Sequence, residues 1–466
     1  MSSWAEERRF WASERRSVRA AVVWVLILFG LLLMFREIHG VSLVCGCGIA
    51  IVACVLIVRR MRAGKDINEY LANRWRTTVS ANLLGMWTAL ARNLRLEVRQ
   101  LDGGVVVAGL GFPRWDRWSC LIPVYLPPGL VKEDLVAVAG RIAQAFGAVR
   151  VSVIGDRLDA LVMRVDYADA LAEPFWFPLG ARWDGRSVLM GLSEDGAEWR
   201  MPLGPHTLVA GASGSGKASL VWGLLLGLSL PIRDGLVEVW GIDRKGGMEL
   251  AMGRGLLTRF ADDAPRAVAL LEDAVAQMQI RARELAGVTR QHVATTESPT
   301  VVVLIDELAA LTAYETDREM LRRANAAIAT LASQGRAVGF VVFACLQNPR
   351  KETLPARGLF TQTVGLRLRD RTETAMVLGD GAVAAGALSH EISPSTPGVA
   401  YVVPEDGSVP IRVRAAYSSD EQIREAAMTY PAPNPRPIEA VPQASAPRPR
   451  RSRSAKPVNA EQMEES

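Results

Sequence analysis

Hydrophobic positions near the N-terminus form two long uninterrupted runs. Residues 20–35 and 41–58 contain no charged side chain. As helices they would span about 24 and 27 Å, close to a hydrocarbon core of about 30 Å. Arginines flank the pair on both sides, whereas the short link between the runs has no formal net charge. We therefore expect a two-helix transmembrane hairpin within residues 1–60, in the plasma membrane, with the N-terminus and the following domains cytoplasmic. A cleaved signal peptide and a buried helical hairpin are the alternatives.

The pattern changes twice after these runs. Residues 61–100 place apolar, aromatic and basic side chains at near-helical spacing, which predicts amphipathic helices that form a connector. Over residues 101–173, short strand patterns and turns surround one helix pattern, which predicts a small α/β domain. Its expected elements are strands at 120–125, 149–154 and 159–165 and a helix at 133–146.

Strand and helix patterns alternate through residues 174–417, which we expect to form one α/β domain. After a β-rich stretch at 174–206, strands are expected at 207–210, 237–242, 301–305 and 338–344, and helices at about 219–230, 265–286 and 318–334. Such alternation predicts a mostly parallel sheet with helices on both faces and ligands at the carboxyl ends of its strands. Residues 418–466 contain many prolines and a basic run, which predict a disordered tail.

A glycine-rich loop lies between the first of these strands and its helix. It runs from Gly211 to Lys217 and fits the pattern G-x-x-x-x-G-K. Its glycines let backbone N–H groups face an anion, and Lys217 adds a positive charge for the outer phosphates. The predicted nucleotide-binding residues are Gly211, Ala212, Ser213, Gly214, Ser215, Gly216, Lys217, Ala218 and Ser219. Ala218 departs from the pattern, because a Ser or Thr hydroxyl at this position normally binds Mg²⁺. A glycine-rich turn without a nucleotide is the alternative.

Polar side chains also follow two later strands. Asp306 and Glu307 come directly after the strand at 301–305, so we expect Asp306 to hold Mg²⁺ and Glu307 to orient and deprotonate the attacking water. Gln347, after the next strand, is a candidate contact to the γ-phosphate or to that water, or else a loop amide. Arg336, just before the same strand, is a candidate arginine finger for a neighbouring subunit's nucleotide, or else a surface arginine.

The overall composition adds few constraints. The chain has 466 residues, of which 49% are hydrophobic, and this is enough for a large core. The formal net charge of +5 is too small to support a claim about nucleic acid by itself. None of the 5 cysteines and 4 histidines has the spacing of a zinc site, so we expect reduced cysteines in a protein that faces the cytoplasm.

Together these motifs resemble the FtsK/SpoIIIE family of membrane-anchored double-stranded DNA translocases, over roughly residues 118–405. Residues 205–217 look like the family's phosphate-loop segment almost position by position. Further similar segments are residues 242–245, 304–308, 335–339 and 344–349. The resemblance implies a RecA-like ATPase motor, ATP and Mg²⁺ as cofactors, and a homo-hexamer around duplex DNA. It also implies that Lys217, Asp306, Glu307 and Gln347 serve the nucleotide, with Arg336 at a subunit interface.

Three features depart from the family's pattern. Ala218 removes the usual Mg²⁺ hydroxyl, only two membrane segments are expected, and the residues after 417 do not resemble the winged-helix domain of chromosome-segregating members. This layout is similar to the transfer translocases of actinobacterial conjugative plasmids and integrative elements. The expected function is ATP-driven movement of such duplex DNA between cells. The alternatives are a chromosome-segregating pump, a protein-export ATPase similar to those of type VII secretion, and a membrane scaffold that binds nucleotide without hydrolysing it.

Overall fold

The structure is a computed structural model that describes residues 69, 71–116, 118–155, 157, 160–180, 183–350, 357–433 and 435–436. The predicted transmembrane hairpin lies outside the described residues, as does the chain from residue 437. Within the described ranges, no helix is long and apolar enough to cross a bilayer. The chain divides into two units, Met1–Ala89 and Leu90–Ser466. A helix over residues 71–93 falls within the segment where amphipathic helices are predicted.

The small α/β domain contains an antiparallel sheet with one helix packed against it. Its strands are β3 (Gly109–Leu110), β4 (Arg114–Asp116), β5 (Ser119–Tyr125), β6 (Arg150–Ile154) and β7 (Leu161–Asp166). They pair in the order β3-β5-β7-β6, with β4 also on β5. Helix α3 (Lys132–Phe146) buries Leu135, Val138 and Ile142 and ends at Gly147, which has a left-handed backbone (φ 62°). A separate hairpin, β1 (Glu97–Arg99) with β2 (Val105–Val107), precedes this sheet.

Within the described residues, the large sheet has ten strands in the order β12-β11-β13-β14-β10-β15-β16-β17-β8-β9. The strands are β8 (Ser187–Ser193), β9 (Glu198–Pro202), β10 (Thr207–Ala210), β11 (Val237–Ile242), β12 (Arg259–Ala261), β13 (Thr300–Ile305), β14 (Phe340–Leu346), β15 (Gln362–Gly365), β16 (Val399–Val403) and β17 (Ile411–Ala415). The run from β12 to β15 is parallel, and the other four strands join it antiparallel. This is the mostly parallel sheet expected for a RecA-like domain.

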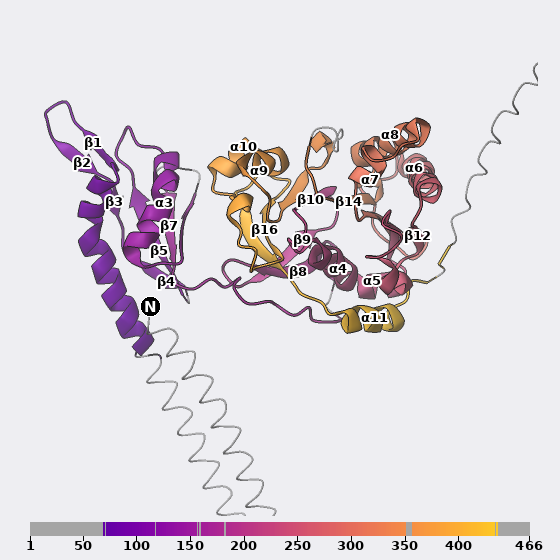
Figure 1. Cartoon of the computed structure of the whole chain (residues 1–466), viewed down its shortest axis with the longest axis horizontal. Coiled ribbons are helices and arrows are strands. Elements are labelled where there is room, and N and C mark those ends of the chain that lie inside the picture. Colours follow the sequence, from indigo (N-terminus) through magenta and orange to yellow (C-terminus); the bar gives the residue numbers. More distant parts are fainter. Residues whose placement is uncertain are drawn as a thin grey trace, which may run out of the picture. The chain divides into compact units, whose positions relative to one another are not determined.

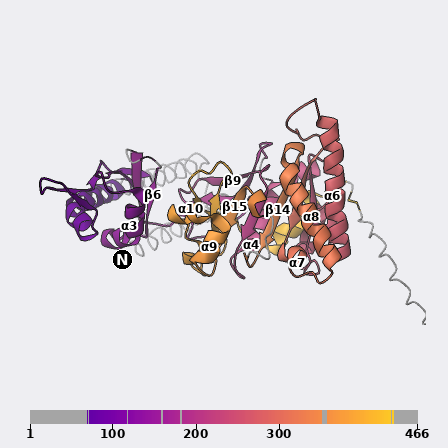
Figure 2. The same cartoon turned by 90° about the horizontal axis from the view of Figure 1, so that it is seen from above.

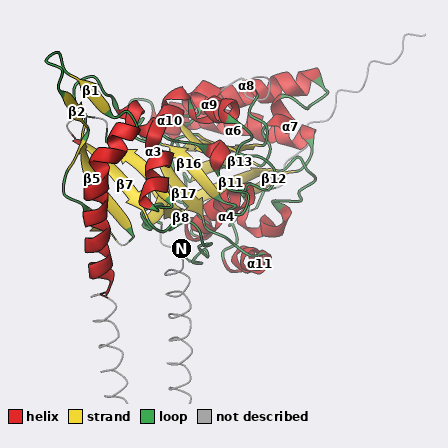
Figure 3. Cartoon of the chain, turned by 60° about the vertical axis from the view of Figure 1, so that its left-hand side comes forward, coloured by secondary structure: helices red, strands yellow, loops and turns green. Residues whose placement is uncertain are grey.

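Helices cover both faces of the parallel strands (Figures 1 and 3). They are α4 (Lys217–Gly227), α5 (Ser229–Arg233), α6 (Ala264–Leu285), α7 (Ala309–Thr312), α8 (Arg318–Gln334), α9 (Arg371–Leu378), α10 (Asp380–Ala384) and α11 (Asp420–Thr429). Alternate residues of β13 enter opposite cores. Val302 and Leu304 pack in the core under α4, whereas Val301 and Val303 pack in the core under α6 and α8. The strand is apolar throughout because both faces are buried. Helices α6 and α8 lie side by side in Figures 1 and 2.

Helix α11 corrects part of the predicted disordered tail. Residues 420–429 are helical, although the whole segment 418–466 is predicted to be disordered. Ser419 Oγ accepts a hydrogen bond from the Gln422 N–H, and Gln422 Oε1 accepts one from the Ser419 N–H, which is a capping box. Ile423 and Ala426 are buried in the core under α4. The capped turn and its apolar face make this segment part of the fold.

Candidate nucleotide site

The glycine-rich loop leaves the carboxyl end of β10 between two parallel neighbours, β14 and β15. The ends of both neighbours hold its start, because the Gly211 N–H donates to the Leu346 carbonyl (3.1 Å) and the Ala212 N–H to the Arg367 carbonyl (2.9 Å). Gly216 has φ 95°, a left-handed conformation that favours glycine. The loop therefore has a fixed shape at the edge where a parallel sheet binds ligands.

Lys217 opens helix α4 and turns back over the loop. Its Nζ donates to the carbonyl oxygens of Gly211 (2.6 Å) and Ala212 (3.3 Å). Burial lowers the pKa of the Lys217 ammonium, while nearby carboxylates, Glu307 among them, act in the opposite direction. The positive charge predicted for the phosphates thus lies at the loop itself. Ala218 is exposed on the first turn of α4, with Ser219 beside it.

Asp306 and Glu307 follow β13, and one strand, β14, separates β13 from the loop strand β10. Both side chains are buried, with only 5% and 7% of the residue surface exposed. Burial raises the pKa of the Glu307 carboxyl. Glu307 Oε1 accepts a hydrogen bond from the backbone N–H of Gln347 (3.3 Å), which links the ends of β13 and β14. The structure therefore brings Asp306, Glu307 and Gln347 to the same edge as the glycine-rich loop.

Lys245 is a site residue that the sequence reasoning did not assign. It lies on the turn after β11, and its Nζ donates to Asp306 Oδ2 at 2.8 Å. The segment 242–245 is part of the family resemblance, and the rule that ligands bind at strand ends applies to it. The sequence does not reveal that β11 pairs directly with β13, and this pairing is what brings Lys245 to Asp306.

Arg336 lies away from the loop of its own chain. It begins a short 3₁₀ helix (Arg336–Val338) before β14, at the amino end of the sheet, whereas the glycine-rich loop is at the carboxyl end. Its guanidinium pairs with Glu405, between β16 and β17. A role for Arg336 as an arginine finger at a neighbouring subunit's nucleotide is still a prediction.

Comparison with known proteins gives this arrangement a family. Residues 172–296 match the model of the FtsK/SpoIIIE family. The chain carries an FtsK/SpoIIIE-family domain. A DNA translocase FtsK of Bacillus cereus is 27% identical over 263 residues, which cover 51% of this chain and 31% of that protein. An ESX secretion system protein EccC of Thermomonospora curvata is 28% identical over 265 residues, covering 52% of this chain and 19% of that protein. The chain thus matches about a third of the length of its FtsK relative.

A solved structure has a similar fold. The conjugation coupling protein TcpA of pCW3, determined as a monomer with ATPγS, superposes with a TM-score of 0.51 at 18% identity. The superposition covers 76% of this chain and 99% of that one. FtsK/SpoIIIE proteins are P-loop ATPases, and this chain's glycine-rich loop and acidic strand end are those of a P-loop ATPase.

The residues at these strand ends fit a bound Mg²⁺ in part. Asp306 is a buried carboxylate, the type of oxygen ligand that binds Mg²⁺, but it is already paired with the ammonium of Lys245. The described residues hold no cluster of three or more His, Cys, Asp or Glu side chains for a metal. Mg²⁺ in nucleotide sites typically binds one or two carboxylates together with phosphates and waters. In this chain the available protein ligand is Asp306, because Ala218 has no hydroxyl to serve as the second one.

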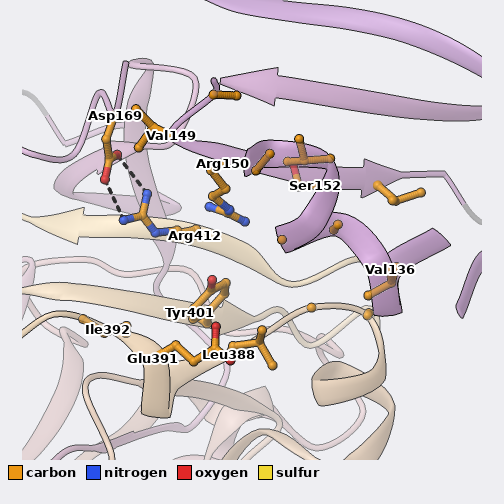
Figure 4. Close-up of a pocket in the computed structure, with 18 of the residues that line it drawn as sticks. Val136, Val149, Arg150, Ser152, Asp169, Leu388, Glu391, Ile392, Tyr401 and Arg412 are labelled. Carbon is orange, nitrogen blue, oxygen red and sulfur yellow. Dashed lines mark hydrogen bonds and ion pairs between the residues drawn. The ribbon is translucent and has the colours of Figure 1, made fainter. Parts of the chain in front are cut away.

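A cavity of about 890 Å³ lies between α3 and β6 of the small domain and residues 385–412 of the domain that contains the large sheet (Figure 4). Its arginines already have acidic partners. Arg412 donates to both carboxylate oxygens of Asp169 (2.9 and 2.8 Å), and Arg150 donates to Glu194 (2.6 Å). These charges join the small domain to the large sheet.

Proposed function

We propose that this chain is a membrane-anchored, ATP-dependent double-stranded DNA translocase. It would act as a homo-hexamer at the plasma membrane and move plasmid or integrative-element DNA between cells in conjugation. ATP with Mg²⁺ would be the energy source, and the motor would face the cytoplasm.

The observation that carries the proposal is the convergence of three strand ends. The glycine-rich loop follows β10, Gln347 follows β14, and Asp306 with Glu307 follows β13, in that order across the sheet. A phosphate cradle and two carboxylates at neighbouring strand ends are the parts that nucleotide hydrolysis needs.

Each residue has a role that its surroundings support. The loop N–H groups and Lys217 would bind the phosphates. Asp306 would hold Mg²⁺, which supplies charge neutralisation to the phosphates when it is bound. Glu307 would accept a proton from the attacking water, and the raised pKa of its buried carboxyl strengthens it as a base. Gln347, tied to Glu307, would position that water.

The assignment of DNA as cargo rests on the comparisons. The matched relatives include proteins named DNA translocase FtsK, and TcpA, with which the fold superposes, is named a conjugation coupling protein. The membrane anchor rests on the predicted hairpin. In a ring, Arg336 would leave Glu405 to reach the nucleotide of a neighbouring subunit.

The proposal is tested by ATP hydrolysis with and without duplex DNA. We expect duplex DNA to stimulate hydrolysis by the full chain. Lys217→Ala should abolish nucleotide binding, and Glu307→Gln should lower the rate at least about 100-fold while binding persists, because general-base catalysis typically contributes this much. Glu272→Gln is the matched control, because Glu272 pairs with Arg323 between α6 and α8. A folded, nucleotide-binding chain with no stimulation by duplex DNA would contradict the proposal.

Protein export is the second candidate, because EccC matches at an identity similar to that of FtsK. Stimulation by a protein cargo where duplex DNA fails would favour it. The scaffold alternative depends on Ala218 alone. It would be favoured if the chain bound ATP without turnover and Ala218→Ser restored hydrolysis.

A further inference from the structure

The turn after β11 places an ammonium group on the carboxylate predicted to hold Mg²⁺. Lys245 Nζ is 2.8 Å from Asp306 Oδ2, within hydrogen-bonding distance. The Asp306 side chain is 8% exposed and that of Lys245 is 42% exposed. Asp306 is therefore the desolvated partner, and a desolvated carboxylate needs a cation nearby.

The position of Lys245 is fixed by its own turn. The buried Asp243 accepts the N–H of Lys245 through Oδ1 (3.0 Å) and the N–H groups of Glu249 (2.8 Å) and Leu250 (3.1 Å) through Oδ2. Glu249 in turn accepts the indole N–H of Trp222 at 3.0 Å. Since Trp222 is on α4, the helix of the glycine-rich loop, this side-chain hydrogen bond ties the turn to that helix.

Because of Ala218, the ion pair between Lys245 and Asp306 bears directly on metal binding. In P-loop enzymes Mg²⁺ is held by the hydroxyl after the lysine together with the aspartate of the acidic strand. Here the hydroxyl is missing, so the metal would depend more heavily on Asp306, the group that Lys245 already occupies.

We propose that Lys245 is a positioning residue that competes with Mg²⁺ for Asp306. Its ammonium neutralises and orients the carboxylate until the metal–nucleotide complex binds, and the metal must displace it. This inference rests on the proposed nucleotide site and deepens it. Its consequence is a weakened affinity for divalent cations, set by a residue outside the phosphate loop and the acidic strand.

The test uses Mn²⁺ as a probe of the Mg²⁺ position. Free Mn²⁺ is measured by electron paramagnetic resonance with the full chain, with and without a saturating non-hydrolysable ATP analogue. Lys245→Met should tighten Mn²⁺ binding at least about tenfold, the size expected for removing a charged hydrogen bond. Lys245→Arg, which keeps the charge, should stay near wild type.

Arg244→Met is the matched control. Arg244 is the neighbouring cation on the same turn, but it pairs with Glu315 (2.9 Å) and not with Asp306. Its loss should change Mn²⁺ affinity less than the loss of Lys245 does, because Arg244 forms its ion pair with Glu315 and not with Asp306. Should the methionine variant of Lys245 fail to fold, Lys245→Gln makes the same comparison while keeping a hydrogen-bond donor.

Two outcomes would separate this inference from the proposed function. If wild type binds the nucleotide analogue but Lys245→Met and Arg244→Met shift Mn²⁺ affinity equally, or not at all, the competition is overturned and the nucleotide site stands. If wild type binds no nucleotide, the proposed function fails, and the measurement with Mn²⁺ alone still decides whether Lys245 and the metal compete for Asp306.

Discussion

His206 fixes the beginning of the loop strand through one buried nitrogen. The residue is 3% exposed, and its Nδ1 accepts a hydrogen bond from the Val342 N–H of β14 at 3.0 Å. Burial, with a smaller contribution from the charge of Arg336, lowers the pKa of His206 to about 4. The imidazole is therefore held neutral, with Nδ1 as the acceptor.

This buried ring predicts a pH dependence of stability. Between the unfolded pKa of 6.5 and the folded pKa of about 4, the unfolded chain binds more protons, so stability falls as the pH falls through that range. At pH 5 the loss from this group is about 2 kcal/mol. His206→Asn keeps an acceptor for Val342 but does not titrate. Urea unfolding at pH 7 and pH 5 should show a smaller loss for the variant. Equal losses in both proteins would contradict the assignment.

The glycine-rich loop lies close against the residue that precedes β16. The Gly398 N–H donates to the Ser215 carbonyl at 2.9 Å. A Cβ on Gly216 would lie 2.2 Å from the Gly398 nitrogen, and Gly216 already has φ 95°. A side chain at this position would push two backbone segments apart.

Gly216→Ala should therefore lower stability by about 1–3 kcal/mol, the typical cost of a strained backbone, and weaken nucleotide binding. Gly204→Ala is the control. Gly204 precedes β10, the strand that leads into the loop, and nothing lies within 4 Å of a Cβ added to it. Thermal unfolding and binding of a fluorescent ATP analogue measure both effects. A Gly216 variant that behaves like the Gly204 variant would show that the close contact does not constrain the loop.

The same elements show what the sequence could and could not predict. The spacing of apolar runs is enough to predict the strands that carry the loop, Asp306 and Gln347, because each strand is short, buried and bounded by turn residues. Strand order is set by tertiary pairing, so the neighbourhood of β11 and β13, and with it Lys245, could not be predicted. Strand β14 begins at Phe340, later than expected, because residues 336–338 form a 3₁₀ turn that ends at the left-handed Gly339. The sequence contains the capping-box residues of α11, but the proline-rich composition of the following segment favours a prediction of disorder for the whole stretch.

At the scale of the whole second unit, buried charges join the small domain to the large sheet. The Asp169–Arg412 pair has side-chain exposures of only 20% and 15%. Burial is the largest single effect on the Asp169 carboxyl and would raise its pKa. The hydrogen bonds and the charge of Arg412, together with smaller contributions, outweigh burial and lower the pKa. Arg414, 4% exposed, donates to the carbonyls of Leu171 and Ala172 at the exit of the small domain and to that of Pro397 before β16. These bonds hold the end of the small domain to the strands next to the nucleotide loop.

Asp169→Asn should destabilise this joint by about 2 kcal/mol, because it leaves Arg412 without its charge partner in a mostly desolvated place. Asp234→Asn is the control, since the Arg233–Asp234 pair is about half exposed on both sides and should contribute less than about 1 kcal/mol. Urea unfolding measures both. Equal, small effects would mean that the joint does not depend on this ion pair.

The central claim, that ATP hydrolysed at this site moves duplex DNA, is tested most directly by displacement of a third strand. A labelled oligonucleotide is bound as a triplex at one end of a linear duplex, and its release by the full chain is followed over time. We expect release that requires ATP and Mg²⁺, is lost with Glu307→Gln, and persists with Glu272→Gln. If the wild-type chain hydrolyses ATP but never displaces the third strand, the account of this protein as a DNA translocase is wrong.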